Sequence, residues 1–230
     1  MKKTFHLLLV PILSLLLAAP GFASIVIDFE TTDGGFTASA GPNFDAPPGT
    51  PVTAAWLYNP GAGWETTEAD DNQVILQSPV FIATAENPVL TFQHAYGFAF
   101  PDDFVNGGIP ELSINSGAFS LITPDGGFPT SGSSGTGGDF IEALDGSRGF
   151  SGGFGDSVTD TATLSSLQPG DLFSVRFRAA WDPSDLFFVD PSWGISSFEV
   201  TNAMVPEPAS GALLLGALGL LGWRRRRASV

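Results

Sequence analysis

Phe173-Ser174-Val175-Arg176-Phe177-Arg178-Ala179 is the stretch of sequence that decides the fold. Apolar and polar residues alternate in it, which is the pattern of a β-strand with one buried face and one solvent-facing face. We expect this strand to span residues 171–180. Similar short stretches, rich in Val, Ile, Phe and Thr and bounded by turn residues, predict strands at 25–30, 73–82, 89–98, 110–114, 119–123, 159–164 and 194–201. This succession predicts an all-β fold, either a sandwich or a barrel.

Two long stretches between the expected strands show no such pattern. Residues 31–72 carry Trp56, Tyr58 and Trp64 among many Gly and Pro residues, and residues 124–157 are mostly Gly, Ser, Thr and Asp. Loops of this length inside a compact domain are usually functional or disordered. We therefore expect two long loops here.

Charge is distributed very unevenly along the chain. Residues 24–204 contain 23 carboxylates, no lysine and three basic residues, Arg148, Arg176 and Arg178, so their formal charge is about −20. Nucleic acid is excluded as a partner because phosphate binding requires a basic surface. An anionic polymer would also be repelled unless divalent cations bridge the two. Cysteine is absent, so no disulfide stabilises the fold.

Both ends of the chain have the composition of targeting signals. Lys2 and Lys3, an apolar run at 7–17 and Gly21-Phe22-Ala23 predict a signal peptide over residues 1–23, with Ser24 as the first mature residue. At the other end, Pro206-Glu207-Pro208 precedes an apolar segment at 209–223. A helix of this segment would be roughly 22 Å long, which is shorter than the ~30 Å hydrocarbon core of a membrane. Four arginines follow it: Arg224, Arg225, Arg226 and Arg227.

This C-terminal arrangement resembles the PEP-CTERM sorting signal of Gram-negative bacteria. The resemblance implies export, transient anchoring in the inner membrane by a short apolar helix, cleavage near the motif by an exosortase, and release to the cell surface or matrix. The family is associated with producers of exopolysaccharide and biofilm. The alternative is an ordinary C-terminal membrane anchor that contains Pro-Glu-Pro. We therefore predict a signal peptide at 1–23, one β-domain at 24–204 and a sorting signal at 205–230.

The middle of the chain resembles secreted jelly-roll modules related to MAM domains and to the C-terminal domains of some secreted bacterial metalloproteases. Five stretches carry this resemblance: Leu76-Gln77-Ser78-Pro79, Leu90-Thr91-Phe92-Gln93-His94, residues 106–113, Val175-Arg176-Phe177-Arg178 and Ser192-Trp193-Gly194-Ile195-Ser196. The resemblance implies a jelly-roll-like antiparallel β-sandwich without catalytic activity. Asn106 and Ser196 stand where the family has Asp, which argues against a metal site on those positions.

Catalytic motifs are weak in this sequence. Gly149-Phe150-Ser151-Gly152-Gly153 fits G-x-S-x-G, but a nucleophile elbow needs a strand before it and a helix after it, and here glycine-rich sequence lies on both sides. His94 is the single histidine of residues 24–204, so it would have to serve any triad, and it cannot supply a typical zinc site. A pair of carboxylates suited to glycoside hydrolysis remains open, because 23 are present.

Calcium is the ligand that the acidic loops favour, since it binds clustered oxygen donors. We expect it at Asp102 and Asp103, or at Asp182 and Asp185. Aromatic residues beside acidic groups are also typical of carbohydrate sites. The candidates are Trp56, Tyr58, Trp64 and Trp181, although tryptophans can equally close the ends of a sandwich.

Together these features predict an exported, non-catalytic matrix protein that binds or organises exopolysaccharide. Two alternatives remain: a secreted glycan hydrolase with paired carboxylates, and a structural surface protein that self-associates by strand addition.

Overall fold

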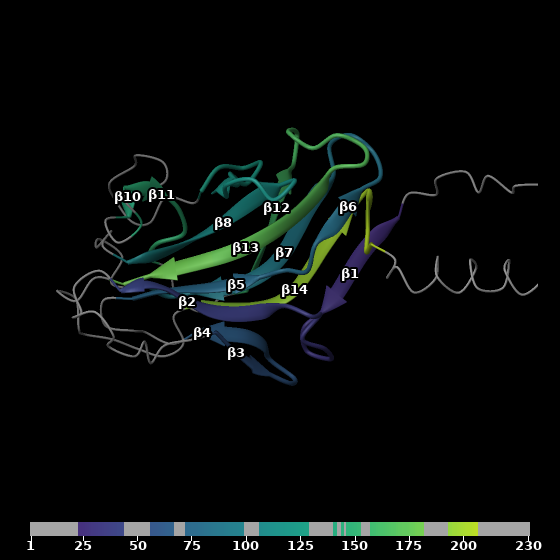
Figure 1. Cartoon of the computed structure of the whole chain (residues 1–230). Helices are drawn as coiled ribbons and strands as arrows, with labels where there is room; N and C mark the ends of the chain where they lie inside the picture. The colour runs from purple at the N-terminus through teal and green to yellow at the C-terminus, as the bar shows by residue number, and fades with distance from the viewer. Residues whose placement is uncertain are drawn as a thin grey trace, which may run out of the picture.

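Two antiparallel sheets pack face to face in a jelly-roll-like β-sandwich (Figure 1). The computed structural model describes residues 23–43, 56–66, 72–98, 106–128, 140–141, 144, 146–152, 157–181 and 193–206. The all-β prediction is confirmed, and the apolar segment expected to form a C-terminal helix lies outside the described residues. In the described part of the chain, no helix is long and apolar enough to cross a membrane.

Among the described residues, sheet A contains six strands and sheet B contains seven. In sheet A the order is β12 (Val158–Thr163), β7 (Val89–Tyr96), β14 (Trp193–Thr201), β4 (Gly63–Thr66) and β3 (Trp56–Asn59), and β1 (Ser24–Asp28) also pairs with β14. In sheet B the order is β15 (Ala203–Met204), β6 (Phe81–Ala83), β13 (Leu172–Ala180), β5 (Asn72–Gln77) and β2 (Thr37–Asn43). On the other side of β13 lie β8 (Gly107–Ile114) and β9 (Ser120–Leu121), and a separate pair consists of β10 (Phe140–Ile141) and β11 (Ser147–Arg148).

β13 is the central strand of sheet B, and its alternation confirms the prediction from sequence. Phe173, Val175 and Phe177 are buried and face sheet A. The ring of Phe177 lies 5.2 Å from that of Phe92 on β7 and 5.7 Å from that of Trp193 on β14. The core between the sheets is therefore largely aromatic, and such rings bury large apolar areas. The intervening residues of β13 point to the outer face of sheet B.

The prediction of a single strand at 73–82 is wrong. The segment is divided into β5 and β6, which both pair with β13. Ser78 lies at the break, before Pro79, which has no N–H to donate. The Ser78 N–H donates to the Val175 carbonyl over 2.8 Å, and the Val175 N–H donates to the Ser78 Oγ over 2.9 Å. The hydroxyl thus replaces a backbone acceptor where the ladder is interrupted.

The prediction of two long loops at 31–72 and 124–157 is also wrong. The first contains β2, β3 and β4, and the second contains the short β10 and β11. β3 and β4 form a hairpin around Pro60 and Gly61. Gly63 has a φ of 105°, and a Cβ at this position would lie 2.3 Å from the Ile195 carbonyl oxygen, so only glycine fits. Pro60, Gly61 and Gly63 therefore belong to the tight turn between these two strands.

The first and last described segments lie side by side at one edge of the sandwich. Ser24 on β1 pairs with Thr201 on β14, and the Ala203 N–H donates to the Ala23 carbonyl over 3.0 Å. In Figure 1 the purple β1 and the yellow end of the described chain meet at this edge. Ala23 and Ala203, close to the first and last described residues, therefore lie at the same edge.

Candidate functional site

Three of the four aromatic residues predicted to bind carbohydrate have their side chains in the core. Trp56 and Trp181 are each 2% exposed, and Trp64 is 6% exposed. Trp56 packs on Trp193 with ring centroids 5.5 Å apart, and the Trp64 Nε1–H donates to the Asp33 carbonyl over 3.2 Å. These tryptophans offer no open ring face in the described structure. The sequence could not distinguish the two arrangements, because apolar rings suit a core and a sugar platform equally well.

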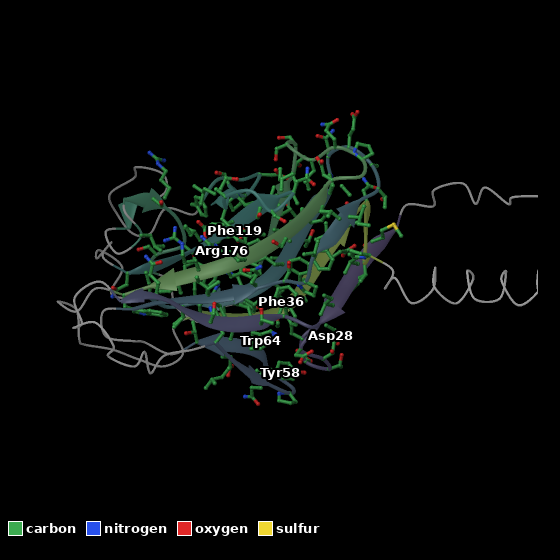
Figure 2. The ribbon with its side chains drawn as sticks, in the orientation of Figure 1. Asp28, Phe36, Tyr58, Trp64, Phe119 and Arg176 are labelled. Atoms are coloured by element: carbon green, nitrogen blue, oxygen red, sulfur yellow. The ribbon has the colours of Figure 1, made fainter. Side chains whose placement is uncertain are left out.

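Tyr58 is the candidate aromatic that retains an exposed surface. Its side chain is half-buried on β3, and its ring lies 5.4 Å from that of Trp64 (Figure 2). Its carbohydrate-binding role stays a prediction.

The candidate calcium ligands Asp102, Asp103, Asp182 and Asp185 lie outside the described residues. Within the described ranges, no three His, Asp or Glu side chains are grouped as a metal site would require. Of the sorting-signal residues, Pro206 is the last one described, and Glu207, Pro208 and the four arginines lie beyond it. Calcium binding therefore stays a prediction.

A buried polar cluster surrounds His94, which is 1% exposed. Its Nε2 lies 2.8 Å from the Asp160 Oδ2, and the Trp193 Nε1–H donates to its Nδ1 over 3.0 Å. Because an indole N–H can only donate, Nδ1 must be the acceptor. The imidazole proton is therefore on Nε2, which donates to the Asp160 carboxylate. Both ring nitrogens are fully used.

This arrangement removes His94 as the base of a serine triad. Phe150 packs on the imidazole at 4.6 Å and forms an isolated β-bridge with Gly108, and residues 149–152, the described part of the G-x-S-x-G stretch, contain no helix. Ser151 is buried beside Phe150. Neither nitrogen of His94 is left to accept its proton, which a nucleophile of this kind requires.

Tyr96 completes the surroundings of His94, with its ring stacked on the imidazole at 5.4 Å. Burial, together with the nearby Asp160 carboxylate, raises the pKa of the Tyr96 phenol to about 12. The phenol is consequently protonated at neutral pH. The cluster joins β7, β12 and β14 and acts as a structural tie within sheet A.

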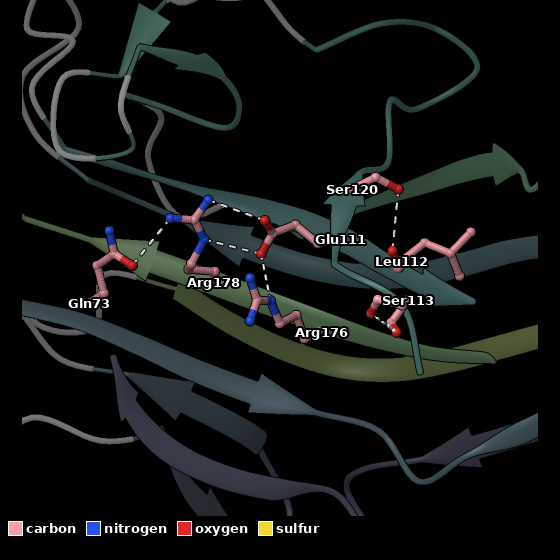
Figure 3. A network of polar contacts seen from close by, with 8 residues as sticks. Gln73, Glu111, Leu112, Ser113, Ser120, Arg176 and Arg178 are labelled. Carbon is pink, nitrogen blue, oxygen red and sulfur yellow. Dashed lines mark hydrogen bonds and ion pairs between the residues drawn. The ribbon is translucent and has the colours of Figure 1, made fainter. Parts of the chain in front are cut away.

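A second polar network lies on the outer face of sheet B, and sequence analysis did not identify it as a site (Figure 3). Glu111 on β8 stands opposite Arg176 on β13 and accepts the Arg176 Nε–H over 2.7 Å. It also accepts two bonds from Arg178, from Nε over 3.1 Å and from Nη2 over 3.2 Å. The Arg178 Nη1–H donates to the Gln73 Oε1 on β5 over 3.2 Å. Three adjacent strands are thus joined by planar polar side chains.

Phe119 adds an aromatic surface to this network. It precedes β9, and the Arg176 Cζ lies 3.9 Å from the centroid of its ring (Figure 2). A guanidinium over an aromatic face is attracted by the ring quadrupole and keeps its plane parallel to it. Glu111 and Phe119 therefore fix the orientation of Arg176 from two sides.

Charge and exposure differ within the outer-face network. The Glu111 side chain is 7% exposed, that of Arg178 is 13% exposed and that of Arg176 is 21% exposed. Two guanidinium groups thus share one buried carboxylate, and Arg176 is the most accessible of the three. The alternation of apolar and polar residues in β13 predicted that both arginines lie on the outer face. It did not predict which strands pair with β13, and this pairing brings Glu111 and Gln73 close to the arginines.

Comparison with known proteins identifies the C-terminal signal. The PEP-CTERM protein-sorting motif family matches residues 205–227, so the sorting signal predicted from Pro206, Glu207, Pro208 and the arginine cluster is confirmed. The motif implies export, anchoring and processing by an exosortase. A search of the curated proteins finds no match.

Two solved structures resemble the chain in outline. One is a xylan-binding module CBM15, with 14% identity and a TM-score of 0.41 over 79% of this chain and 97% of that chain. The other is the C-terminal CBM6 of LamC from Zobellia galactanivorans, with 11% identity and a TM-score of 0.33 over 78% of this chain and 99% of that chain. A likeness of this degree assigns no ligand to the chain.

Proposed function

We propose that this chain is an exported surface protein that binds or organises extracellular polysaccharide of a biofilm matrix without catalysing a reaction. The observation that carries the proposal is the outer-face network of sheet B, formed by Gln73, Glu111, Arg176 and Arg178 beside Phe119. Fixed planar donors and acceptors next to an aromatic ring are the groups that orient a polar ligand. The face of a sheet can accommodate an extended chain of sugars.

The position of the network supports this role while the protein is still anchored. Met204, near the end of the described chain, pairs with Ile82 on β6, and Ile82 pairs with Leu172 at the start of β13. Arg176 and Arg178 lie four and six residues further along β13, at roughly 13–20 Å for ~3.3 Å per residue. The network therefore lies away from the edge at which the described chain ends.

Calcium forms a second part of the proposal. Asp102 and Asp103 follow the described segment that ends at Phe98, and Asp182 and Asp185 follow Trp181. Clustered carboxylates supply the oxygen donors that calcium prefers, and bound calcium would also reduce the repulsion between this acidic chain and an acidic polymer. Calcium should therefore strengthen retention on the matrix.

The test is retention of the purified full chain, kept in non-ionic detergent, on the exopolysaccharide of the producing cell, with calcium and then with chelator. We expect retention that Arg178→Gln weakens, because this change removes donors from the network. Arg148→Gln removes the same charge from β11, outside both sheets, and serves as the matched control. Absence of retention in either condition would contradict polysaccharide binding.

Two further measurements separate the alternatives. Release of reducing ends from the polysaccharide would indicate the hydrolase, whereas sedimentation that increases with concentration in the absence of glycan would indicate self-association. Recovery of the protein in the membrane fraction with Arg224, Arg225, Arg226 and Arg227 still attached would contradict processing by an exosortase.

A further inference from the structure

Among the described residues, the outer-face network of sheet B has two positive charges and one negative charge, in a chain that is otherwise strongly acidic. Residues 24–204 contain three basic side chains, and two of them, Arg176 and Arg178, lie two positions apart on one face of β13. Among the described residues, Glu111 is the carboxylate within ion-pair distance of both. One positive charge on this face therefore has no described counterpart, although 23 carboxylates are present in the domain.

Arg176 has a pair of donors available for a ligand. Its Nε–H is bonded to Glu111, and its plane is held by Phe119. The two Nη groups at the end of the guanidinium make no hydrogen bond to the described residues, and Figure 3 draws them without a contact. The Arg176 side chain is 21% exposed, the largest exposed fraction among the three charged side chains of the network. Two parallel N–H groups of one guanidinium match the two oxygens of a carboxylate.

We propose that the end of Arg176 is a subsite for the carboxylate of an acidic sugar, so that the polysaccharide bound on this face is a polyuronate. The inference rests on the proposed polysaccharide binding and specifies its substrate class. A sugar hydroxyl would leave the excess positive charge of the network uncompensated, whereas a carboxylate neutralises it. The remaining charge of the chain repels an acidic polymer at long range, but salt screens exposed charges beyond about 8 Å at physiological ionic strength. Contact at the subsite is therefore compatible with the negative charge elsewhere.

The experiment compares two probes that differ only in their acidic group. The full chain in non-ionic detergent is titrated calorimetrically, at physiological salt and with chelator present, with an oligogalacturonate and with the same oligomer after reduction of its carboxyl groups. We expect the acidic oligomer to bind more tightly. We expect Arg176→Gln to weaken its binding roughly tenfold to a hundredfold, as for loss of a charge-assisted hydrogen bond. Arg176→Lys keeps the charge without the paired donors and should give an intermediate loss.

Arg148→Gln is the matched control, and it should change affinity by less than about twofold because its charge lies on β11. Near-ultraviolet circular dichroism checks that each variant is folded, and the Arg176→Lys result stands if Arg176→Gln fails to fold. Equal binding of both oligomers, or equal losses in the Arg176 and Arg148 variants, would overturn the uronate subsite and leave polysaccharide binding intact. Failure to bind these oligomers together with failure to bind the native exopolysaccharide would overturn both.

Discussion

Replacing Glu111 by Gln tests how much the outer-face network contributes to stability. The carboxylate accepts three hydrogen bonds from two guanidinium groups, over 2.7, 3.1 and 3.2 Å. The amide of Gln keeps the shape of the side chain but has one acceptor oxygen and carries no charge. At least one guanidinium would therefore point its donors at an NH₂ group, and both would lose their counter-charge.

The expected loss follows from burial. Removing one partner of a fully buried ion pair costs about 3–5 kcal/mol. The Arg176 and Arg178 side chains are 21% and 13% exposed, so water can partly solvate them once the carboxylate is gone. We therefore expect Glu111→Gln to lower the free energy of unfolding by about 2–4 kcal/mol. For a domain of this size the melting temperature should fall by on the order of 5–10 °C.

Urea denaturation followed by tryptophan fluorescence provides the measurement, since Trp56, Trp64, Trp181 and Trp193 are all buried. Glu199→Gln is the matched control: Glu199 accepts a hydrogen bond from the exposed Ser24 hydroxyl, and its loss should cost less than about 0.5 kcal/mol. Equal midpoints for the two variants would refute the claim that the network stabilises sheet B.

Three further changes test other parts of the structure. Trp193→Phe leaves the buried His94 Nδ1 without its donor and should cost about 1–3 kcal/mol by urea denaturation, and a cost below about 0.5 kcal/mol would contradict the assigned bond. Ser78→Ala removes the hydroxyl that accepts the Val175 N–H and should cost about 1–3 kcal/mol, whereas an unchanged midpoint would show that water replaces it. The folded-state pKa of Tyr96 is raised from 10.0 to about 12, so its contribution is fully present below pH 10 and is lost as the pH rises towards 12. Midpoints measured from pH 9 to 12 should therefore fall less steeply for Tyr96→Phe than for the parent chain, and identical slopes would contradict this reasoning.

Alternation predicted the strands that lie in the middle of each sheet. β7, β13 and β14 agree with the expected ranges to within two residues at each end, because each has a buried face and an outer face of different composition. The sequence failed where strands are short and bounded by turns. β3 and β4 are four residues each, and the glycines and prolines between and around them suggested a loop. The sequence did contain a sign of β3: Trp56 and Tyr58 stand two positions apart, as residues on one face of a strand do, and a Pro-Gly turn follows them.

The site was harder to predict than the fold because it depends on strand order. Arg176 and Arg178 were placed on an outer face by alternation, yet Glu111 is 65 positions from Arg176 and Gln73 is 105 positions from Arg178. Only the pairing of β8 and β5 on either side of β13 brings them together. The prediction for the tryptophans had a different weakness. Their neighbours in the sequence suggested a sugar-binding platform, but Trp56, Trp64 and Trp181 are packed in the core.

Each sheet contains a hydrogen-bond network of polar side chains across three adjacent strands. The two networks differ in how many of their donors and acceptors are already bonded within the protein. In sheet A, His94 on β7 is bonded to Asp160 on β12 and to Trp193 on β14, and neither of its nitrogens remains available. In sheet B, Glu111 accepts three hydrogen bonds from two arginines, but the end of Arg176 is not bonded within the described part of the chain. A buried network whose donors and acceptors are all bonded can only hold strands together. A network that holds strands together and also has unbonded donors can bind a ligand, which is why we propose the site on sheet B and not at His94.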